Sequence, residues 1–416
     1  MIQLSSADTD GRVRAEPRLE LLARSGWEEA PPDGLIPAPA GTTIAHLPYR
    51  FAVGRDRETK RVSLEPEGRL AVAAILPPGY LRTWLPAYVE AANAPVLPLY
   101  GYAAVGMVDG RPQVAALRTD SWEAWDPAAP GRDRIGRYIG AARRALPDNR
   151  LVDHLEICAT DYRCLTAQNL FLRRGEAAIP VSPACNAACL GCISEQWGDV
   201  VSPQARMPFA PTPVEVAELA AWHLKRGIDN FVSFGQGCEG EPLTRGEALV
   251  TAVRIIRQSA PEATIHINTN GSRPGVLRRL IDAGLNSARI SIFSLDDATF
   301  RAYYRPVGYG LGDVTACADL LSEAGAQVTI NLLTFPGITD APDEIDRLVA
   351  FIRTHGVHQV QLRSLNVDPG WLLARMPRRT RGIGMVRFVG QLGERCPGLR
   401  LGNFTRPWPA RAPALA

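Results

Sequence analysis

From about residue 176 onward the chain alternates between two patterns of apolar and polar residues. Short apolar runs, typical of buried strands, are each followed by a segment whose apolar residues recur at helical spacing. The expected strands are 178–182, 230–235, 264–270, 287–293, 327–335 and 360–365. The expected helices are 213–227, capped by Thr212, then 246–260, 274–284, 313–324 and 343–356. This alternation predicts βαβ units and a parallel sheet, and leaves a doubly wound sheet and an incomplete barrel both open.

The N-terminal part of the chain, residues 1–175, lacks this alternation. It contains apolar runs separated by Pro-rich breaks, which we interpret as a mixed α+β domain. Its clearest local signal is Asp109-Gly110 between the apolar runs 101–108 and 111–117. Asp-Gly between two such runs predicts a tight β-hairpin.

The C-terminal segment is rich in Arg and Pro and contains one expected helix at 383–394. It is interpreted either as a solvated tail or as a contact surface for an anionic substrate or partner. The expected domains are therefore 1–175, 176–368 and 369–416.

Composition and charge restrict the partners and the cellular compartment expected for the protein. The 416 residues carry a net charge of +3, which gives no support for a nucleic-acid partner. No run of about 18 apolar residues predicts a membrane span. The N-terminus lacks the basic and apolar regions of a secretory signal, so a cytoplasmic protein is expected. In that compartment the eight cysteines would be thiols or metal ligands rather than disulfides.

Three of these cysteines form a compact motif after the first expected strand. Cys185, Cys189 and Cys192 are spaced C-x3-C-x2-C. Three thiolates on one short loop can bind three corners of a cubane iron–sulfur cluster and leave the fourth iron without a protein ligand. A zinc site completed by a distant fourth ligand is the alternative.

The cysteine loop and the elements around it resemble the radical S-adenosylmethionine (radical SAM) superfamily over roughly residues 176–366. The resemblance implies a partial (β/α)6 TIM-like barrel that binds a [4Fe–4S] cluster on Cys185, Cys189 and Cys192. It further implies that S-adenosylmethionine (SAM) is cleaved to a 5′-deoxyadenosyl radical, which takes hydrogen from a small-molecule or peptide substrate. A reductant such as flavodoxin or ferredoxin is implied as the partner. The family usually has an aromatic or large apolar residue where this chain has Gly191.

The same resemblance suggests the SAM-binding positions. Gly240-Glu241-Pro242 looks like the family's Gly-Gly-Glu-Pro segment, so Glu241 or the carbonyls beside it would accept hydrogen bonds from the SAM ammonium group. Glu239 is the competing carboxylate. The remaining candidates are polar residues on or just after apolar strands, which either bond to one another or face SAM: Asn268, Asn270, Ser291, Ser294 and Asn331.

Several polar residues have weaker assignments. Gln361 and Arg363 alternate with apolar residues on the sixth strand and would face the barrel interior or pair with acidic neighbours. Cys158 and Cys164 are either two buried thiols, ligands of an auxiliary cluster or a redox pair. A non-catalytic iron–sulfur protein, a zinc protein and a binding module without turnover remain the competing hypotheses.

Overall fold

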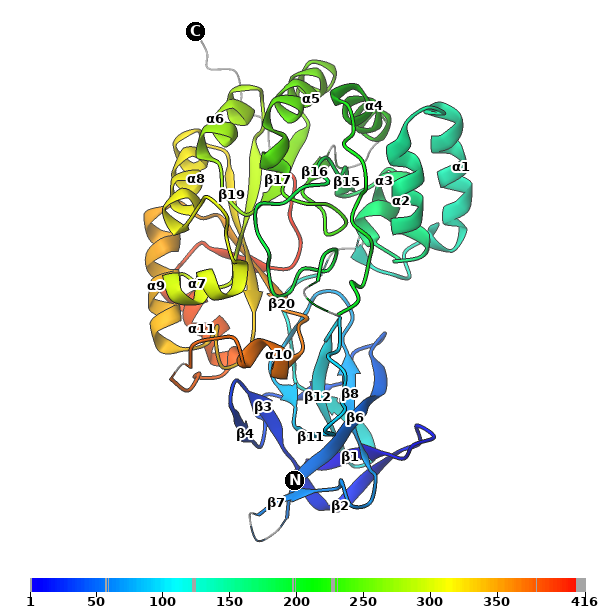
Figure 1. Ribbon diagram of the computed structural model, residues 1–416, viewed down its shortest axis with the longest axis vertical. Coiled ribbons are helices and arrows are strands. Elements are labelled where there is room, and N and C mark those ends of the chain that lie inside the picture. The colour runs from blue at the N-terminus through cyan, green and yellow to red at the C-terminus, as the bar shows by residue number, and fades with distance from the viewer. Residues whose placement is uncertain are drawn as a thin grey trace. The chain divides into compact units, whose positions relative to one another are not determined.

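The computed structural model describes residues 2–408 except 57, 59, 122–124, 197, 199, 226–228, 230 and 379. The chain forms two compact units (Figure 1). The first contains Met1–Asp120, Leu333–Ala350 and Leu362–Asn403, and the second contains Ser121–Leu332, Phe351–Gln361 and Phe404–Ala416.

The first unit is built mainly from antiparallel strands. Among the described residues its largest sheet has nine strands in the order β11-β6-β2-β1-β8-β12-β13-β5, with β7 paired to β6. Two small sheets have the orders β10-β3-β4 and β14-β9. The strands are β1 (Gln3–Ala7), β2 (Val13–Leu21), β3 (Ala23–Ser25), β4 (Glu28–Ala30), β5 (Ile36–Pro37), β6 (Thr43–Arg55), β7 (Arg61–Ser63), β8 (Leu70–Ile75), β9 (Tyr80–Arg82), β10 (Leu85–Pro86), β11 (Tyr88–Glu90), β12 (Tyr102–Val108), β13 (Arg111–Val114) and β14 (Ala116–Arg118).

The expected hairpin is present in this unit. β12 pairs antiparallel with β13, and Asp109 and Gly110 both have positive φ, 49° and 72°. A two-residue turn with positive φ at both positions matches the right-handed twist of the flanking strands, which explains the Asp-Gly pair. Helices α10 (Pro369–Leu373) and α11 (Met385–Arg395) belong to this unit, and α11 confirms the helix expected at 383–394.

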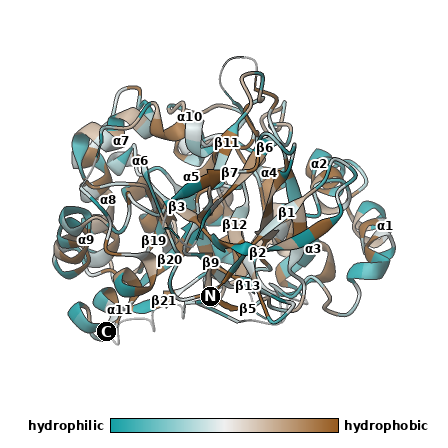
Figure 2. Ribbon diagram, turned by 90° about the horizontal axis from the view of Figure 1, so that it is seen from below, coloured by the Kyte–Doolittle hydropathy of each residue, from teal (hydrophilic) through white to brown (hydrophobic). Residues whose placement is uncertain are grey.

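The second unit begins with three helices that the sequence interpretation placed in the N-terminal domain. They are α1 (Ile135–Ala145), α2 (Arg150–Thr160) and α3 (Leu165–Leu172). Their apolar residues pack with α4 and β15, so the first break between units falls after Asp120 rather than at the expected residue 175. Figure 2 shows α1 with hydrophilic and hydrophobic residues side by side, as expected of a helix with one buried face.

A seven-stranded sheet follows in the order β15-β16-β17-β18-β19-β20-β21. The pairings from β15 through β19 are parallel. This sequential order excludes a doubly wound sheet, in which the strand order reverses. Within the described chain no pairing joins β15 to β21, so the barrel is open. The strands are β15 (Ala177–Ala178), β16 (Phe231–Phe234), β17 (Thr264–Thr269), β18 (Ser287–Ile292), β19 (Gln327–Thr334), β20 (Gln359–Ser364) and β21 (Arg400–Gly402).

Helices connect these strands, as expected for a partial (β/α)6 TIM-like barrel. Figure 1 shows α4, α5, α6 and α8 along the outer side of the strands. The expected N-cap is present, because the Thr212 hydroxyl accepts from the Glu215 backbone N–H in a capping box. The helices are α4 (Pro213–Leu224), α5 (Gly246–Ser259), α6 (Pro274–Asp282), α7 (Asp297–Tyr304), α8 (Leu311–Glu323) and α9 (Pro342–Thr354).

Two details differ from the expected elements. The first strand was expected at 178–182 but ends at Ala178, because Pro180 has no N–H to donate and the Val181 and Ser182 amides bond to a side chain instead. Helix α7 was not predicted, and its last residues are Tyr303 and Tyr304.

A search of the described helices for a long apolar stretch finds none that could cross a lipid bilayer.

Candidate functional site

The cysteine loop follows β15 and is joined by backbone hydrogen bonds to the turn after β16. Gly240 N–H donates to the Ser182 carbonyl at 2.7 Å, and Glu241 N–H donates to the Ala184 carbonyl at 2.8 Å. A Cβ on Gly240 would lie 2.0 Å from the Ala184 carbonyl oxygen, so a residue with a side chain does not fit here. Gly240 therefore allows the turn to approach the residue next to Cys185.

The C-terminal end of α7 holds the other side of the same loop. The Tyr304 carbonyl accepts from Ala188 N–H and the Tyr303 carbonyl accepts from Leu190 N–H, both at 3.0 Å. Arg305 has a left-handed φ of 46° and ends the helix. The carbonyls of Tyr303 and Tyr304 therefore have no N–H partner within the helix and can accept from the loop. The loop between Cys185 and Cys192 is thus fixed from two sides.

The three thiols of the loop influence one another electrostatically. Burial raises the pKa of Cys189 well above its usual range, and the neighbouring Cys185 and Cys192 raise it further. Burial also raises the pKa of Cys185. Thiols such as those of Cys185 and Cys189, whose ionisation is disfavoured by burial, need a cation beside them to become thiolates. The donor set therefore fits a metal centre.

Arg206 lies beside the third cysteine. Its Nη2 is 3.5 Å from the Cys192 Sγ, its Nε is 3.3 Å from the Ser194 Oγ, and it forms an ion pair with Glu195. A guanidinium at a thiolate sulfur stabilises the negative charge. Arg206 was missed from the sequence because it lies in a segment without a recognisable motif.

Glu239 ties the start of the cysteine loop to the end of β16. Its Oε2 accepts from the Val181 and Ser182 amides at 2.6 and 2.9 Å. Its Oε1 accepts from the Gly235 and Gln236 amides, both at 2.7 Å. The side chain is buried, and each oxygen accepts two N–H bonds. Glu239 is therefore fully used in holding the backbone together.

We expect Glu239→Gln to destabilise the second unit strongly. The amide group of Gln would face two buried N–H donors that lose their acceptor, at about 1–3 kcal/mol each. The measurement is thermal unfolding followed by circular dichroism. Glu247→Gln is the control, because that side chain is 82% exposed. Equal unfolding temperatures for the two variants would contradict this assignment of Glu239.

Glu241 is buried between the turn and the end of β17. Its Oε1 accepts from Leu243 N–H at 3.0 Å and from the Thr269 hydroxyl at 2.6 Å. Its Oε2 accepts a single bond, from Asn270 N–H at 2.8 Å. Burial raises the pKa of Glu241 to about 7. Pro242 begins the short helix η3 (Pro242–Arg245), for which Glu241 is the N-cap. Glu241 thus keeps acceptor capacity on Oε2.

The two asparagines after Ile267 have different surroundings. Asn268 donates to the Ser233 hydroxyl and the Phe234 carbonyl, and its Oδ1 lies 3.0 Å from His266 Nε2. Its polar atoms are thus engaged inside the barrel. Asn270 donates to the Asn186 Oδ1 at 2.9 Å, which connects the end of β17 directly to the cysteine loop.

Ser291 and Asn331 face each other across β18 and β19. They are register partners, and Asn331 Nδ2 donates to the Ser291 Oγ at 3.3 Å. Both remain partly exposed although the residues on either side are buried, so they line accessible space. Ser294 instead accepts from Asp296 N–H at 3.0 Å within a turn.

A polar network joins β18 to β20 and to Thr405, which follows β21. Arg289 Nη1 donates to the Gln361 Oε1 at 2.5 Å, and Gln361 Nε2 donates to the Thr405 hydroxyl at 2.7 Å. Gln361 is buried, and its bond with Arg289 joins the sixth strand to β18.

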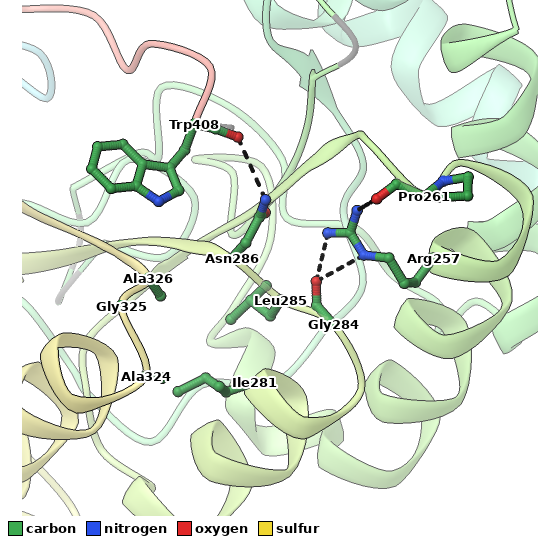
Figure 3. Close-up of a pocket in the computed structure, with 10 residues that line it drawn as sticks. All are labelled: Arg257, Pro261, Ile281, Gly284, Leu285, Asn286, Ala324, Gly325, Ala326 and Trp408. Carbon is green, nitrogen blue, oxygen red and sulfur yellow. Dashed lines mark hydrogen bonds between the residues drawn. The ribbon is translucent and has the colours of Figure 1, made fainter. Parts of the chain in front are cut away.

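A cavity of about 240 Å³, whose lining Figure 3 shows, is lined by none of these residues. It is lined by residues that precede β18 and β19, including Leu285, Asn286 and Ala326. In barrels of this kind chemistry occurs at the carboxyl ends of the strands, whereas the opposite end serves stability. We therefore place the functional site at the cysteine loop and the carboxyl ends of β16 to β19.

The segment that contains the cysteine loop is also similar to known proteins. Residues 179–352 match the model of the Radical SAM superfamily. The FeMo cofactor biosynthesis protein NifB of Klebsiella pneumoniae is 25% identical over 216 residues, covering 49% of this chain and 46% of NifB. GTP 3′,8-cyclase of Erythrobacter litoralis is 28% identical over 194 residues, covering 44% of this chain and 52% of that protein. The chain thus spans about half the length of these curated relatives.

Among solved structures, Streptococcus suis SuiB bound to S-adenosylmethionine aligns with a TM-score of 0.41 and 13% identity. The alignment covers 65% of this chain and 66% of SuiB.

The segment 179–352, which holds the cysteine loop, is a radical SAM domain. The cofactors of this superfamily are a [4Fe–4S] cluster and SAM.

Proposed function

We propose that this protein is a radical SAM enzyme that holds its [4Fe–4S] cluster on Cys185, Cys189 and Cys192. When bound, the cluster supplies the electron that splits SAM into methionine and a 5′-deoxyadenosyl radical. The observation that carries the proposal is the position of the cysteine loop, which is fixed between the Gly240-Glu241 turn and α7.

The chain's own residues have separate tasks in this proposal. The three thiolates would bind three irons of the cluster, and the fourth iron would be left for SAM. Glu241 Oε2 accepts from the SAM ammonium group, while Asn270 maintains the turn against the loop. Ser291 and Asn331 offer a hydroxyl and an amide to the polar groups of SAM. Asn268, with both ends of its amide engaged, maintains the shape of the barrel interior.

The loop geometry also argues against a single zinc ion at this place. Ligands of one tetrahedral zinc ion lie about 3.8 Å apart when the bonds are about 2.3 Å. Among the described residues, Cys185, Cys189 and Cys192 do not form a group in which all three sulfur atoms lie within 4.8 Å of one another. Ligands to three different irons of one cubane can be further apart.

The substrate and the electron donor extend this proposal. We propose a small-molecule or peptide substrate and a reductant such as flavodoxin or ferredoxin. An oxygen-sensitive, thiolate-held cluster in a chain with eight free cysteines suits the reducing cytoplasm.

The test is anaerobic reconstitution with iron and sulfide, followed by addition of dithionite and SAM. We expect 5′-deoxyadenosine to form slowly even without substrate, because a cluster on this loop would lie beside the Gly240-Glu241 turn proposed to bind SAM. The product is measured by chromatography and mass spectrometry. A protein that holds a full cluster and is reduced normally, yet never cleaves SAM, would instead support a non-catalytic electron-transfer role.

A further inference from the structure

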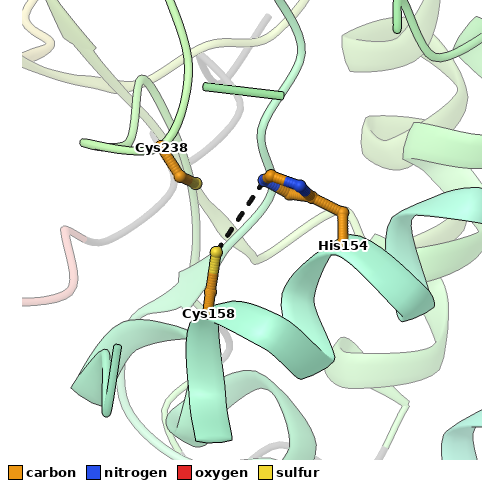
Figure 4. Close-up of side chains that lie close together, drawn as sticks. All are labelled: His154, Cys158 and Cys238. Carbon is orange, nitrogen blue, oxygen red and sulfur yellow. Dashed lines mark hydrogen bonds between the residues drawn. The ribbon is translucent and has the colours of Figure 1, made fainter. Parts of the chain in front are cut away.

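A second group of metal-ligating side chains lies outside the cysteine loop. His154 and Cys158 are four residues apart on α2, which puts them on the same face of the helix. Cys238 comes from the turn after β16, and Figure 4 shows the three side chains converging. His154 Nε2 is 3.8 Å from the Cys158 Sγ, and all three ligand atoms lie within 4.8 Å of one another.

We propose that His154, Cys158 and Cys238 bind one zinc ion. Two thiolates and one imidazole are ligands that zinc prefers, and they neutralise its charge. Zinc bonds of about 2.0–2.3 Å in a tetrahedron place neighbouring ligand atoms about 3.5–3.8 Å apart. The observed spacing therefore needs adjustments of only about 1 Å.

The surroundings hold the three ligands in place. The Cys238 carbonyl accepts from Met207 N–H at 2.8 Å, which fixes the backbone of the turn. The Phe209 ring meets the His154 ring edge to face at 6.3 Å. Cys158 and Cys238 are buried, whereas His154 is partly exposed and gives the ion a way in. Fixed ligands and an entry path are what a metal site requires.

Cys164 is not a member of this group. It was paired with Cys158 in the sequence interpretation, but its Sγ lies 3.0 Å from the Thr166 hydroxyl. The fourth zinc position is therefore left to water or another outside ligand. The His-x3-Cys spacing on α2 is the sequence signal that could have pointed to this group. Cys238 is far away in the sequence, and only the fold brings it to the other two residues.

This site is distinct from the proposed cluster site but adjoins the same turn. Cys238 precedes Glu239, which holds the start of the cysteine loop, by one residue. A zinc ion would thus tie α2 to the turn that carries Glu241.

The test uses the full chain with Cys185, Cys189 and Cys192 replaced by Ala, so that iron and zinc at the loop do not contribute. After zinc is supplied and excess metal is removed by dialysis, mass spectrometry should find about one zinc per chain. His154→Gln and the double change Cys158→Ala with Cys238→Ala should weaken zinc binding about ten-fold or more. Cys164→Ala is the matched control and should retain zinc.

Thermal unfolding compares each variant with and without zinc, so a variant of lower stability can still be tested for zinc binding. Zinc should raise the unfolding temperature of the parent and of Cys164→Ala relative to a chelator, because a ligand of the folded state stabilises it. It should not raise that of His154→Gln. Zinc-edge absorption of the parent should show two sulfur neighbours at about 2.3 Å.

Three results would overturn the proposal: no zinc in the parent, zinc retained by the His154 and cysteine variants, or a Cys158–Cys238 disulfide in the purified parent. Failure here would leave the proposed function intact, because that proposal depends on iron at the other three cysteines and on SAM cleavage.

Discussion

Replacement of Cys185, Cys189 and Cys192 by Ala is expected to abolish both iron binding at the loop and SAM cleavage. The reconstituted wild-type chain should bind about four irons and be brown and sensitive to oxygen. The variant should bind almost none, because no thiolates remain on the loop. Iron and sulfide analysis together with visible absorbance measures this difference, and 5′-deoxyadenosine formation measures its consequence.

The matched control replaces three other cysteines, Cys164, Cys317 and Cys396, by Ala. Cys317 donates to the Gly271 carbonyl at 3.2 Å, and Cys396 is buried at the end of α11. None of the three belongs to the loop or to the His154 group. This control should keep its iron and its SAM cleavage. If the loop variant retained about four irons per chain, the cluster would be elsewhere and the assignment would be wrong.

Much of the barrel could be predicted from the sequence because its signals are local. Apolar periodicity and the Thr212 cap each depend on a few neighbouring residues, as does the Asp109-Gly110 turn of the first unit. The three proposed cluster cysteines could be singled out for the same reason, since one loop carries them all. Helix α7 was missed because its eight residues, DATFRAYY, are short and contain two tyrosines.

The contacts that arrange the site were harder to predict. Glu239 and Glu241 are two residues apart on one turn, and sequence similarity suggested only that Glu241 fits the motif. Their separate roles depend on donors from distant segments, the Val181 amide for one and the Asn270 amide for the other. The His154 group similarly joins two segments about 80 residues apart, so no local pattern could reveal it.

Substitution of Glu241 by Gln is expected to weaken SAM binding about ten- to hundred-fold, the effect of losing a charge-assisted hydrogen bond worth roughly 1.5–3 kcal/mol. Iron content should not change, because the backbone bond from Glu241 N–H to Ala184 does not involve the side chain. The Gln amide deprives one buried donor, the Asn270 N–H, of its acceptor, against two donors at Glu239. The measurement is SAM binding to the reconstituted, unreduced protein. Glu247→Gln, an exposed change on α5, is the control.

The pH dependence of SAM binding tests whether the negative charge of Glu241 contributes to SAM affinity. Burial raises the pKa of Glu241 to about 7, so the carboxylate that attracts the ammonium group is only partly ionised near neutral pH. The wild-type protein should therefore bind SAM more tightly as the pH rises through 7, because the ionised fraction increases. Glu241→Gln cannot ionise and should lack this increase. Equal pH profiles, or unchanged SAM affinity in the variant, would mean that the carbonyls of the turn hold the ammonium group and that Glu241 serves only to fix Thr269 and Asn270.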